Sequence, residues 1–275
     1  MSSPTVLKDD ALPSRKWRAQ LIHVSAVVLF LVTSFAYLDM NPFMFVTEFH
    51  YVADLVEEML PPSLFVIWQK AHLWSSVGET FAMAFLGTFV GALLAFILAL
   101  FTARNTTPHP WICGPMRTLL GAQRAAPDFA IMLVIVVAVG FGPFAGTIAL
   151  VIGSTGMFGK LFADAIEQID PQTLESLEAV GSSRLQIVRF AIVPEVAPSF
   201  IANTLYLFEI NVGSAVALGV FGGGGLGFEL HIANSTLNYP DLLAYIVVIT
   251  AMMVFVERVS DFLRKRIFQT GGALK

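Results

Sequence analysis

The sequence predicts an all-α fold, a polytopic membrane bundle of about six transmembrane helices. Hydrophobic residues make up 56% of the 275 residues, and charged residues make up 13%. The mean hydropathy of +0.74 exceeds what a soluble domain of this length needs for its core. The apolar residues form long runs that lack the alternating pattern of a transmembrane β-barrel, which leaves helices as the spanning elements.

Long apolar runs mark the expected spans. A span needs about 20 mostly apolar residues to cross about 30 Å of hydrocarbon. Approximately six stretches qualify, at residues 19–38, 81–101, 125–141, 143–162, 198–221 and 242–256. A signal peptide is the alternative for the first stretch, but the run is long and the following LDMNPF lacks a small-residue cleavage pattern. We therefore expect a span there.

The distribution of Lys and Arg predicts the orientation, because these residues favour the cytoplasmic side of short loops. If six spans alternate, four clusters of basic residues fall on one side: Lys8, Arg15, Lys16 and Arg18; Arg104, Arg117 and Arg124; Lys160, Arg184 and Arg189; and Arg264, Lys265 and Arg266. The opposite side receives residues 39–79. That loop holds Glu48, Asp54, Glu57 and Glu58 against a lone Lys70. Both termini and the loop after the fourth span are therefore expected in the cytoplasm.

That cytoplasmic loop contains a polar stretch, LESLEAVGSSRLQIVRFAIVPEVAPSF, between two apolar segments. Asp170 followed by Pro171 predicts a helix start, and Gly181 predicts its end. Apolar residues recur at three-residue intervals on one face, which makes the helix amphipathic. They are Leu174, Leu177 and Val180.

A second helical segment is expected after Gly181. It carries Arg184 and Arg189, and we expect it to be interrupted at Pro194 and Pro198 before the next span. Two interpretations of the amphipathic helix remain open at this point. It covers the end of the bundle, or it is the surface on which a partner pushes.

At these residues the sequence resembles the permease subunits of ABC importers. Their cytoplasmic loop has a Glu-Ala-Ala, three residues, Gly, nine residues, Ile-x-Leu-Pro pattern, and Glu175, Gly181 and Pro194 match it at the family's spacing. The positions that depart from the pattern are Ser176, Leu177, Ala191 and Val193. The short motif is therefore matched in part.

A wider match covers roughly residues 81–266. Separated motifs look like those of the phosphonate-transporter permeases, often called PhnE, and they occur in the same order. These motifs are RAAPDFA (124–130), GFGPFAG (140–146), GSSRLQ (181–186), LYLFEIN (205–211) and GGGGLG (222–227).

The resemblance implies a type I importer (MetI-like) permease of the bacterial cytoplasmic membrane, carrying phosphonate, phosphate or phosphite. It implies a second permease subunit, identical or paralogous, a PhnC-like ATPase dimer that binds ATP and Mg, and a PhnD-like binding protein outside. This chain would itself hold no catalytic, cofactor or metal site and bind no nucleic acid. The expected coupling residues are Leu174, Glu175, Leu177, Glu178, Gly181, Arg184 and Pro194.

The corresponding domain division has three parts. Residues 1–76 form a cytoplasmic tail, the first span and an acidic external loop. Residues 77–268 form the permease domain with a coupling loop at 164–198, and residues 269–275 form a tail.

Two glycine-rich segments imitate nucleotide-binding motifs. GSTGMFGKL (153–161) has the wrong spacing for a phosphate-binding P-loop and has Leu161 where a hydroxyl is required. We interpret its small residues as a helix packing surface. GGGGLG lacks the strand and helix of a dinucleotide site, and its glycines permit a bend near an external gate or a plain flexible turn.

Polar residues within the expected spans are candidates for the translocation pathway, because ionisable groups at the bilayer centre usually face protein or water. They are Arg124, Asp128, Glu209 and Asn211, to which we add Gly213, Gly222, Gly223, Gly224 and Gly225 as pathway or gate residues. Arg124 and Asp128 are expected one helical turn apart, with Arg124 extending to the cytoplasmic interface in the favoured interpretation. Glu209 lies about halfway along its expected span and cannot reach the interface, so it should pair with a polar group inside the bundle. Arg124 is a candidate partner. PhnE relatives often have Arg where Gly213 stands, so no role of that arginine is carried over.

The remaining chemistry is sparse. Cys113 is the single cysteine, and the five histidines are scattered without ligand spacing: His23, His50, His72, His109 and His231. Three functional classes remain in view. They are a phosphorus-oxyanion permease, an ABC permease for another small solute, and an ATP-independent transporter or intramembrane enzyme that uses Asp128 and Glu209.

Overall fold

The computed structural model describes residues 15–39, 43–107 and 109–272, and Lys8 lies outside them. The described residues form helices and turns and contain no strand. The chain divides into two compact units, Met1–Glu58 and Met59–Lys275. Each unit is described by itself below.

The first unit contains the first predicted span and the start of the acidic loop. Helix α1 covers Arg15–Tyr37, and none of its apolar window is buried, as expected of a helix that faces lipid. The loop is itself helical, with α2 at Met44–Thr47 and α3 at Phe49–Met59.

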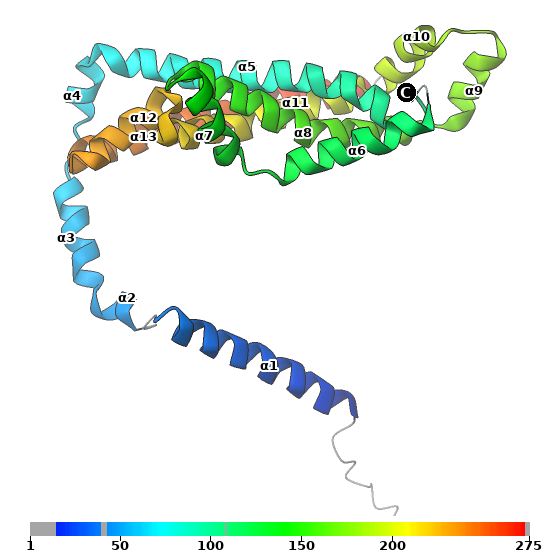
Figure 1. The fold of residues 1–275 in the computed structure, drawn as a ribbon. Helices are drawn as coiled ribbons and strands as arrows, with labels where there is room; N and C mark the ends of the chain where they lie inside the picture. The colour runs from blue at the N-terminus through cyan, green and yellow to red at the C-terminus, as the bar shows by residue number, and fades with distance from the viewer. Residues whose placement is uncertain (1–14, 40–42, 108, 273–275) are drawn as a thin grey trace, which may run out of the picture. The chain divides into compact units, whose positions relative to one another are not determined.

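The second unit is a helical bundle with two distinct ends (Figure 1). Its helices are α4 (Leu64–Gln69), α5 (Ala71–Thr102), α6 (Pro110–Ala125), α7 (Asp128–Val139), α8 (Pro143–Glu167), α9 (Pro171–Ala179), α10 (Arg184–Ile187), α11 (Val193–Leu218), α12 (Gly225–Ser235) and α13 (Tyr239–Gly272). We call the end that carries α9 and α10 the α9 end, and the end that carries α4 and α12 the α12 end. Within the described residues, five helices are long and apolar enough to cross a membrane, and α6 with α7 makes a sixth if the bent pair is one span.

Small residues bring α5 and α8 into close packing at the centre of this unit. A Cβ atom added at Gly87 would lie 2.5 Å from Cβ of Leu150, and one added at Gly91 would lie 2.6 Å from Cβ of Ser154. Such close approach of helix backbones is the usual way in which helices associate in lipid. The two helices therefore form the central packed pair of the bundle.

The third predicted span, residues 125–141, is wrong as a single straight helix. Helix α7 has 12 residues, which is about 18 Å and too short to cross about 30 Å of hydrocarbon. Helix α6 precedes it, and the two helices meet at an angle of 90°. Pro127 explains the break, because the residue before a proline is pushed out of the helical conformation and Ala126 is extended.

The predicted interruption at Pro194 and Pro198 is also wrong. Helical structure continues from Arg184 to Gly223 and includes both prolines. A π-helical turn at Val188–Ile192 lies directly before Pro194. Proline lacks an N–H group and its ring crowds the preceding turn, and a widened turn accommodates both defects.

Asn211 ties the three central helices together at mid-height. Its side-chain Nδ2 on α11 donates to Oγ1 of Thr88 on α5 at 2.8 Å and to Oγ of Ser154 on α8 at 2.8 Å. All three side chains are buried. A polar group at this depth must find its partners within the protein.

The Asn211 bonds make a first testable prediction. Asn211→Leu removes both donors and leaves two buried hydroxyl groups short of a partner, so the purified protein should lose about 0.6 to 2 kcal/mol of stability. Thermal unfolding in detergent measures the change.

The matched control is Asn203→Leu on the same helix, because the Asn203 side chain bonds only Ser199, one turn away. The control should unfold close to the wild-type temperature. Equal melting temperatures for Asn211→Leu and the control would contradict a role for Asn211 between helices.

Candidate coupling and transport sites

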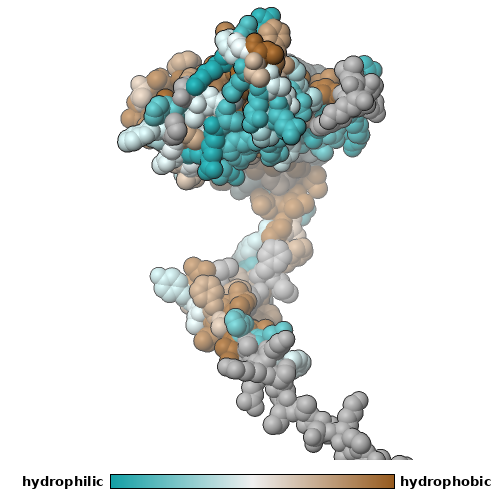
Figure 2. All heavy atoms as spheres, turned by 90° about the vertical axis from the view of Figure 1, so that its right-hand side faces the viewer, coloured by the Kyte–Doolittle hydropathy of each residue, from teal (hydrophilic) through white to brown (hydrophobic). Residues whose placement is uncertain are grey.

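The α9 end presents mostly hydrophilic residues, as Figure 2 shows from that side. Helix α9 begins as predicted, because the Asp170 side chain accepts a hydrogen bond from Gln172 N at 3.0 Å. It also ends as predicted. Gly181 has a positive φ of 79°, and Gly181 N and Ser182 N donate to the carbonyls of Glu178 and Leu177. This paired pattern is a Schellman cap.

One face of α9 packs on the bundle. Leu174 is buried and Leu177 packs against the same apolar cluster. Val180 departs from the predicted face, because it is the C-cap residue and is 77% exposed. The carboxylates of Glu175 and Glu178 lie on exposed residues. Helix α9 is thus held by two leucines and presents acidic residues outward.

The segment after Gly181 continues this surface. Ser183 N donates to Oε1 of Gln186 at 2.7 Å, which starts α10. Ile187 is buried against the bundle, whereas Leu185 and Phe190 are 78% and 65% exposed. Apolar side chains that stay exposed at the hydrophilic end indicate a surface that another protein covers.

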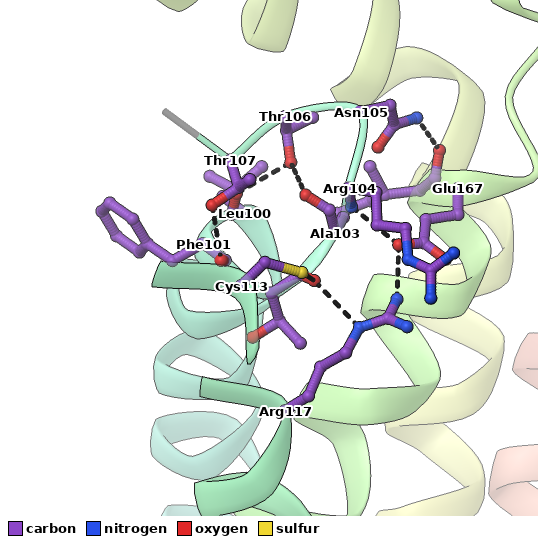
Figure 3. A network of polar contacts seen from close by, with 12 residues as sticks. Leu100, Phe101, Ala103, Arg104, Asn105, Thr106, Thr107, Cys113, Arg117 and Glu167 are labelled. Carbon is purple, nitrogen blue, oxygen red and sulfur yellow. Dashed lines mark hydrogen bonds and ion pairs between the residues drawn. The ribbon is translucent and has the colours of Figure 1, made fainter. Parts of the chain in front are cut away.

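A polar network fixes the base of this surface (Figure 3). Oε1 of Glu167, the last residue of α8, accepts from Arg104 N at 2.7 Å and forms an ion pair with Arg117 of α6. Arg117 Nε also donates to the Thr102 carbonyl at the end of α5, and Asn105 Nδ2 donates to the Ile166 carbonyl at 2.7 Å. The Arg117 guanidinium therefore bonds a carbonyl at the C-terminal end of α5 and the carboxylate at the C-terminal end of α8. Sequence reasoning did not find this network, because its members lie far apart in the chain.

A cavity of about 250 Å³ lined by both polar and apolar residues lies beside the Asn211 bonds, between α6, α7, α8 and α11. Its lining residues are Gln123, Arg124, Asp128, Leu150, Gly153, Ser154, Met157, Leu207, Ile210, Asn211 and Ser214. Of the predicted pathway residues, Arg124, Asp128 and Asn211 come together here. Gln123, Ser154 and Ser214 were missed, because single hydroxyl and amide groups within apolar runs give no periodic signal.

The extension of Arg124 to the cytoplasmic interface stays a prediction. The residue is exposed and stands one position before the end of α6. It lies about 21 Å along α6 from Pro110 and lines the cavity with Ser154 and Asn211. Arg124 and Asp128 are not one turn apart on one helix. The break at Pro127 places them on α6 and α7, on the wall of the same cavity.

Glu209 lies outside this cavity and pairs with α13. Its Oε2 is 3.4 Å from Arg264 Nη2, which also lies 3.7 Å from Oδ1 of Asp261. The Arg264 guanidinium stands 5.9 Å from the centroid of the Tyr206 ring. The expected pairing of Glu209 is thus present, but the partner is Arg264 and not Arg124. Gly213 also faces α13, since an added Cβ would lie 3.3 Å from Met253 Cε.

The glycine run forms a kink between α11 and α12 at the α12 end. Gly222 has a non-helical φ of 101° and kinks the backbone there, and its carbonyl accepts from Gly142 N at 2.9 Å. Gly225 N donates to Glu79 Oε2 at 3.1 Å, and Leu226 N donates to Thr80 Oγ1 at 2.8 Å. The glycines therefore make a bend that is bonded to α5 and is more ordered than a plain flexible turn. Gly223 and Gly224 lie within the same bend.

The P-loop-like glycines lie within α8, as the packing interpretation predicts. An added Cβ at Gly159 would lie 2.8 Å from Leu120, and one at Gly156 would lie 3.0 Å from Gln123. The glycines thus bring α6 close to α8. Within the described residues there is no cluster of three or more His, Cys, Asp or Glu side chains that would suit a metal ion.

Comparison with known proteins assigns the family. A family model described as the binding-protein-dependent transport system inner membrane component matches residues 87–269. The putative phosphite transport system permease protein HtxC of Stutzerimonas stutzeri is 38% identical over 217 residues, covering 79% of this chain and 76% of that protein. The phosphate-import permease protein PhnE of Mycolicibacterium smegmatis is 34% identical over 236 residues, covering 86% of this chain and 44% of that protein.

Solved structures confirm the MetI-like fold. The inward-facing MetNI methionine ABC transporter matches with a TM-score of 0.62 at 18% identity, covering 71% of this chain and 95% of that chain. A bacterial alginate ABC transporter matches with a TM-score of 0.61 at 14% identity, covering 92% and 99%. The order of motifs, the helical bundle and the family match agree. The chain therefore belongs to the binding-protein-dependent transport system inner membrane component family and is a multi-pass membrane permease.

Proposed function

We propose that this permease carries phosphite, phosphonate or phosphate into the cell as the membrane subunit of an ATP-driven importer. The observation that carries the proposal is the agreement among its relatives. HtxC and PhnE, and the phosphite transport system permease PtxC of Stutzerimonas stutzeri at 36% identity, are all named for phosphorus oxyanions. Methionine permeases are more distant, at 27% identity.

In this proposal, ATP hydrolysis and substrate capture belong to partner proteins. The α9 end faces the cytoplasm, where Glu175, Glu178 and the exposed Leu185 and Phe190 meet an ATPase dimer that binds ATP and Mg. The α12 end faces an external binding protein. A second permease subunit, identical or paralogous, completes the membrane part. The basic residues of the α9 end support this orientation, with Arg104, Arg184 and Arg189 among them.

Uptake by the reconstituted complex tests the substrate class. Proteoliposomes that contain the permease, its ATPase and its binding protein should import phosphite, phosphate or methylphosphonate and hydrolyse ATP. Without the binding protein, we expect no binding tighter than about 1 µM, because the cavity offers a single cation to an oxyanion.

The result that would contradict the substrate proposal is uptake of another small solute, such as methionine, with no uptake of any phosphorus oxyanion. Tight oxyanion binding by the permease and ATPase alone would contradict the division of labour.

Gly181 provides a test of coupling. Its φ of 79° is one that β-branched residues resist, whereas the space around an added Cβ is open. Gly181→Val should therefore strain the α9 cap by about 1 to 2 kcal/mol and lower both uptake and binding-protein-stimulated ATP hydrolysis. Membrane insertion should be unchanged.

Gly181→Asn is the matched control, since asparagine tolerates the left-handed conformation. It should keep most of the wild-type coupled hydrolysis. Normal coupled uptake by well-expressed Gly181→Val would remove the coupling role of this cap.

A further inference from the structure

The cavity beside Asn211 has the chemistry of an oxyanion site, and this inference rests on the proposed function. Its volume of about 250 Å³ is several times the share of about 30 Å³ that one water takes in the liquid. Helix α8 contributes Ser154 near its middle, so the cavity lies at the depth where charged side chains are most costly. A cation kept there requires an explanation.

Arg124 is that cation. Its side chain makes no ion pair or hydrogen bond to any described residue, whereas Arg117 and Arg264 are both paired with carboxylates. A guanidinium presents several N–H donors in a fork that fits two oxygens of one phosphoryl group. An arginine that is left unpaired at the cavity wall is therefore available to a ligand.

Neutral hydroxyl groups line the same cavity as Arg124. Ser154 Oγ accepts from Asn211 Nδ2, which leaves its O–H group free to donate. Ser214, one turn of α11 beyond Asn211, lines the same cavity, and its hydroxyl has no hydrogen bond to the part of the chain that the structure describes. Two hydroxyl groups and one guanidinium suit an anion with several acceptor oxygens.

Asp128 opposes an anion in the same cavity. Its carboxylate lies against α8 at Gly153, where an added Cβ would come within 2.5 Å of Oδ1. With both groups ionised, the charges of Arg124 and Asp128 cancel. A site of this kind receives an oxyanion without retaining it, which is what a passage through a membrane requires.

We infer that this cavity is the transit site for the phosphorus oxyanion. Arg124, Ser154 and Ser214 contact the phosphoryl oxygens, and Asp128 is the opposing charge that speeds release. A charge-assisted hydrogen bond changes an equilibrium constant about tenfold to a hundredfold. The loss of Arg124 should therefore be visible in transport without altering the contact with the ATPase.

The experiment compares variants of the full complex in proteoliposomes, with phosphite, phosphate and methylphosphonate as probes. For Arg124→Gln, we expect about tenfold less oxyanion imported per ATP hydrolysed, while binding-protein-stimulated hydrolysis stays near the wild-type rate. Ser214→Ala should lower the same ratio by a smaller factor. For Asp128→Asn, uptake should become sensitive to inhibition by the same oxyanion placed inside the vesicles, because the site then retains its ligand.

Arg258→Gln is the matched control, because Arg258 is an exposed arginine of α13 beside Val254 and Phe255, away from the cavity. It removes one positive charge and should keep the wild-type ratio. If Arg124→Gln does not assemble, two other variants provide the test. Arg124→Lys keeps the charge and loses the forked donor geometry, and Ser214→Ala removes one hydroxyl group. Each should lower the amount of oxyanion imported per ATP hydrolysed.

The inference is overturned if the Arg124 and Ser214 variants keep the wild-type ratio, or if Arg258→Gln lowers it equally. A parallel fall of uptake and hydrolysis would assign Arg124 to structure or coupling and would also overturn it. These outcomes are distinct from failure of the proposed function, in which the wild-type complex itself imports none of the three oxyanions.

Discussion

The close packing of α5 on α8 is the constraint on which the rest of the second unit depends. Gly87 and Gly91 let the two backbones approach so closely that no larger side chain fits between them. In lipid there is little hydrophobic force between helices, so such contacts and the hydrogen bonds they enclose hold a bundle together. Asn211 uses this proximity. Its amide reaches Thr88 and Ser154 at once, which fixes α11 against both helices.

The central cavity follows from that packing together with one defect in the neighbouring chain. Pro127 ends the run of α6, and the 90° turn into α7 leaves the ends of both helices beside α8. Arg124 and Asp128 therefore line one cavity from two different helices. Gly153 makes room for the carboxylate where any side chain would fill the space. The break at Pro127 thus lets Arg124 and Asp128 line one cavity from two helices, whereas a single straight helix would hold both residues on its own axis.

The sequence predicted the features that local chemistry determines. Helix α9 was placed correctly from Asp170 and Gly181, because a cap depends on residues within one turn. The break at Pro127 and the turn before Pro194 were misjudged, since the fate of a helix at proline depends on which neighbours accept the freed backbone groups. The pairing of Glu209 with Arg264 and of Arg117 with Glu167 was missed for a related reason. These partners lie on different helices, and no periodicity relates one helix to another.

Helices α8 and α11 connect the two candidate sites. Helix α11 follows the π-helical turn at Val188–Ile192, passes Asn211 and Ser214, and ends at the kink in Gly219–Gly223. An unbroken helix moves as one body, and the weak points here are the widened turn before α11 and the kink after it. In the proposed transport cycle, a displacement of α10 by the ATPase passes through the turn at Val188–Ile192 before it reaches Asn211 and Ser214 on α11. Helix α8 runs without a break from Ser154 to Glu167, so in the same proposed cycle it links the opposite wall of the cavity to the α9 end.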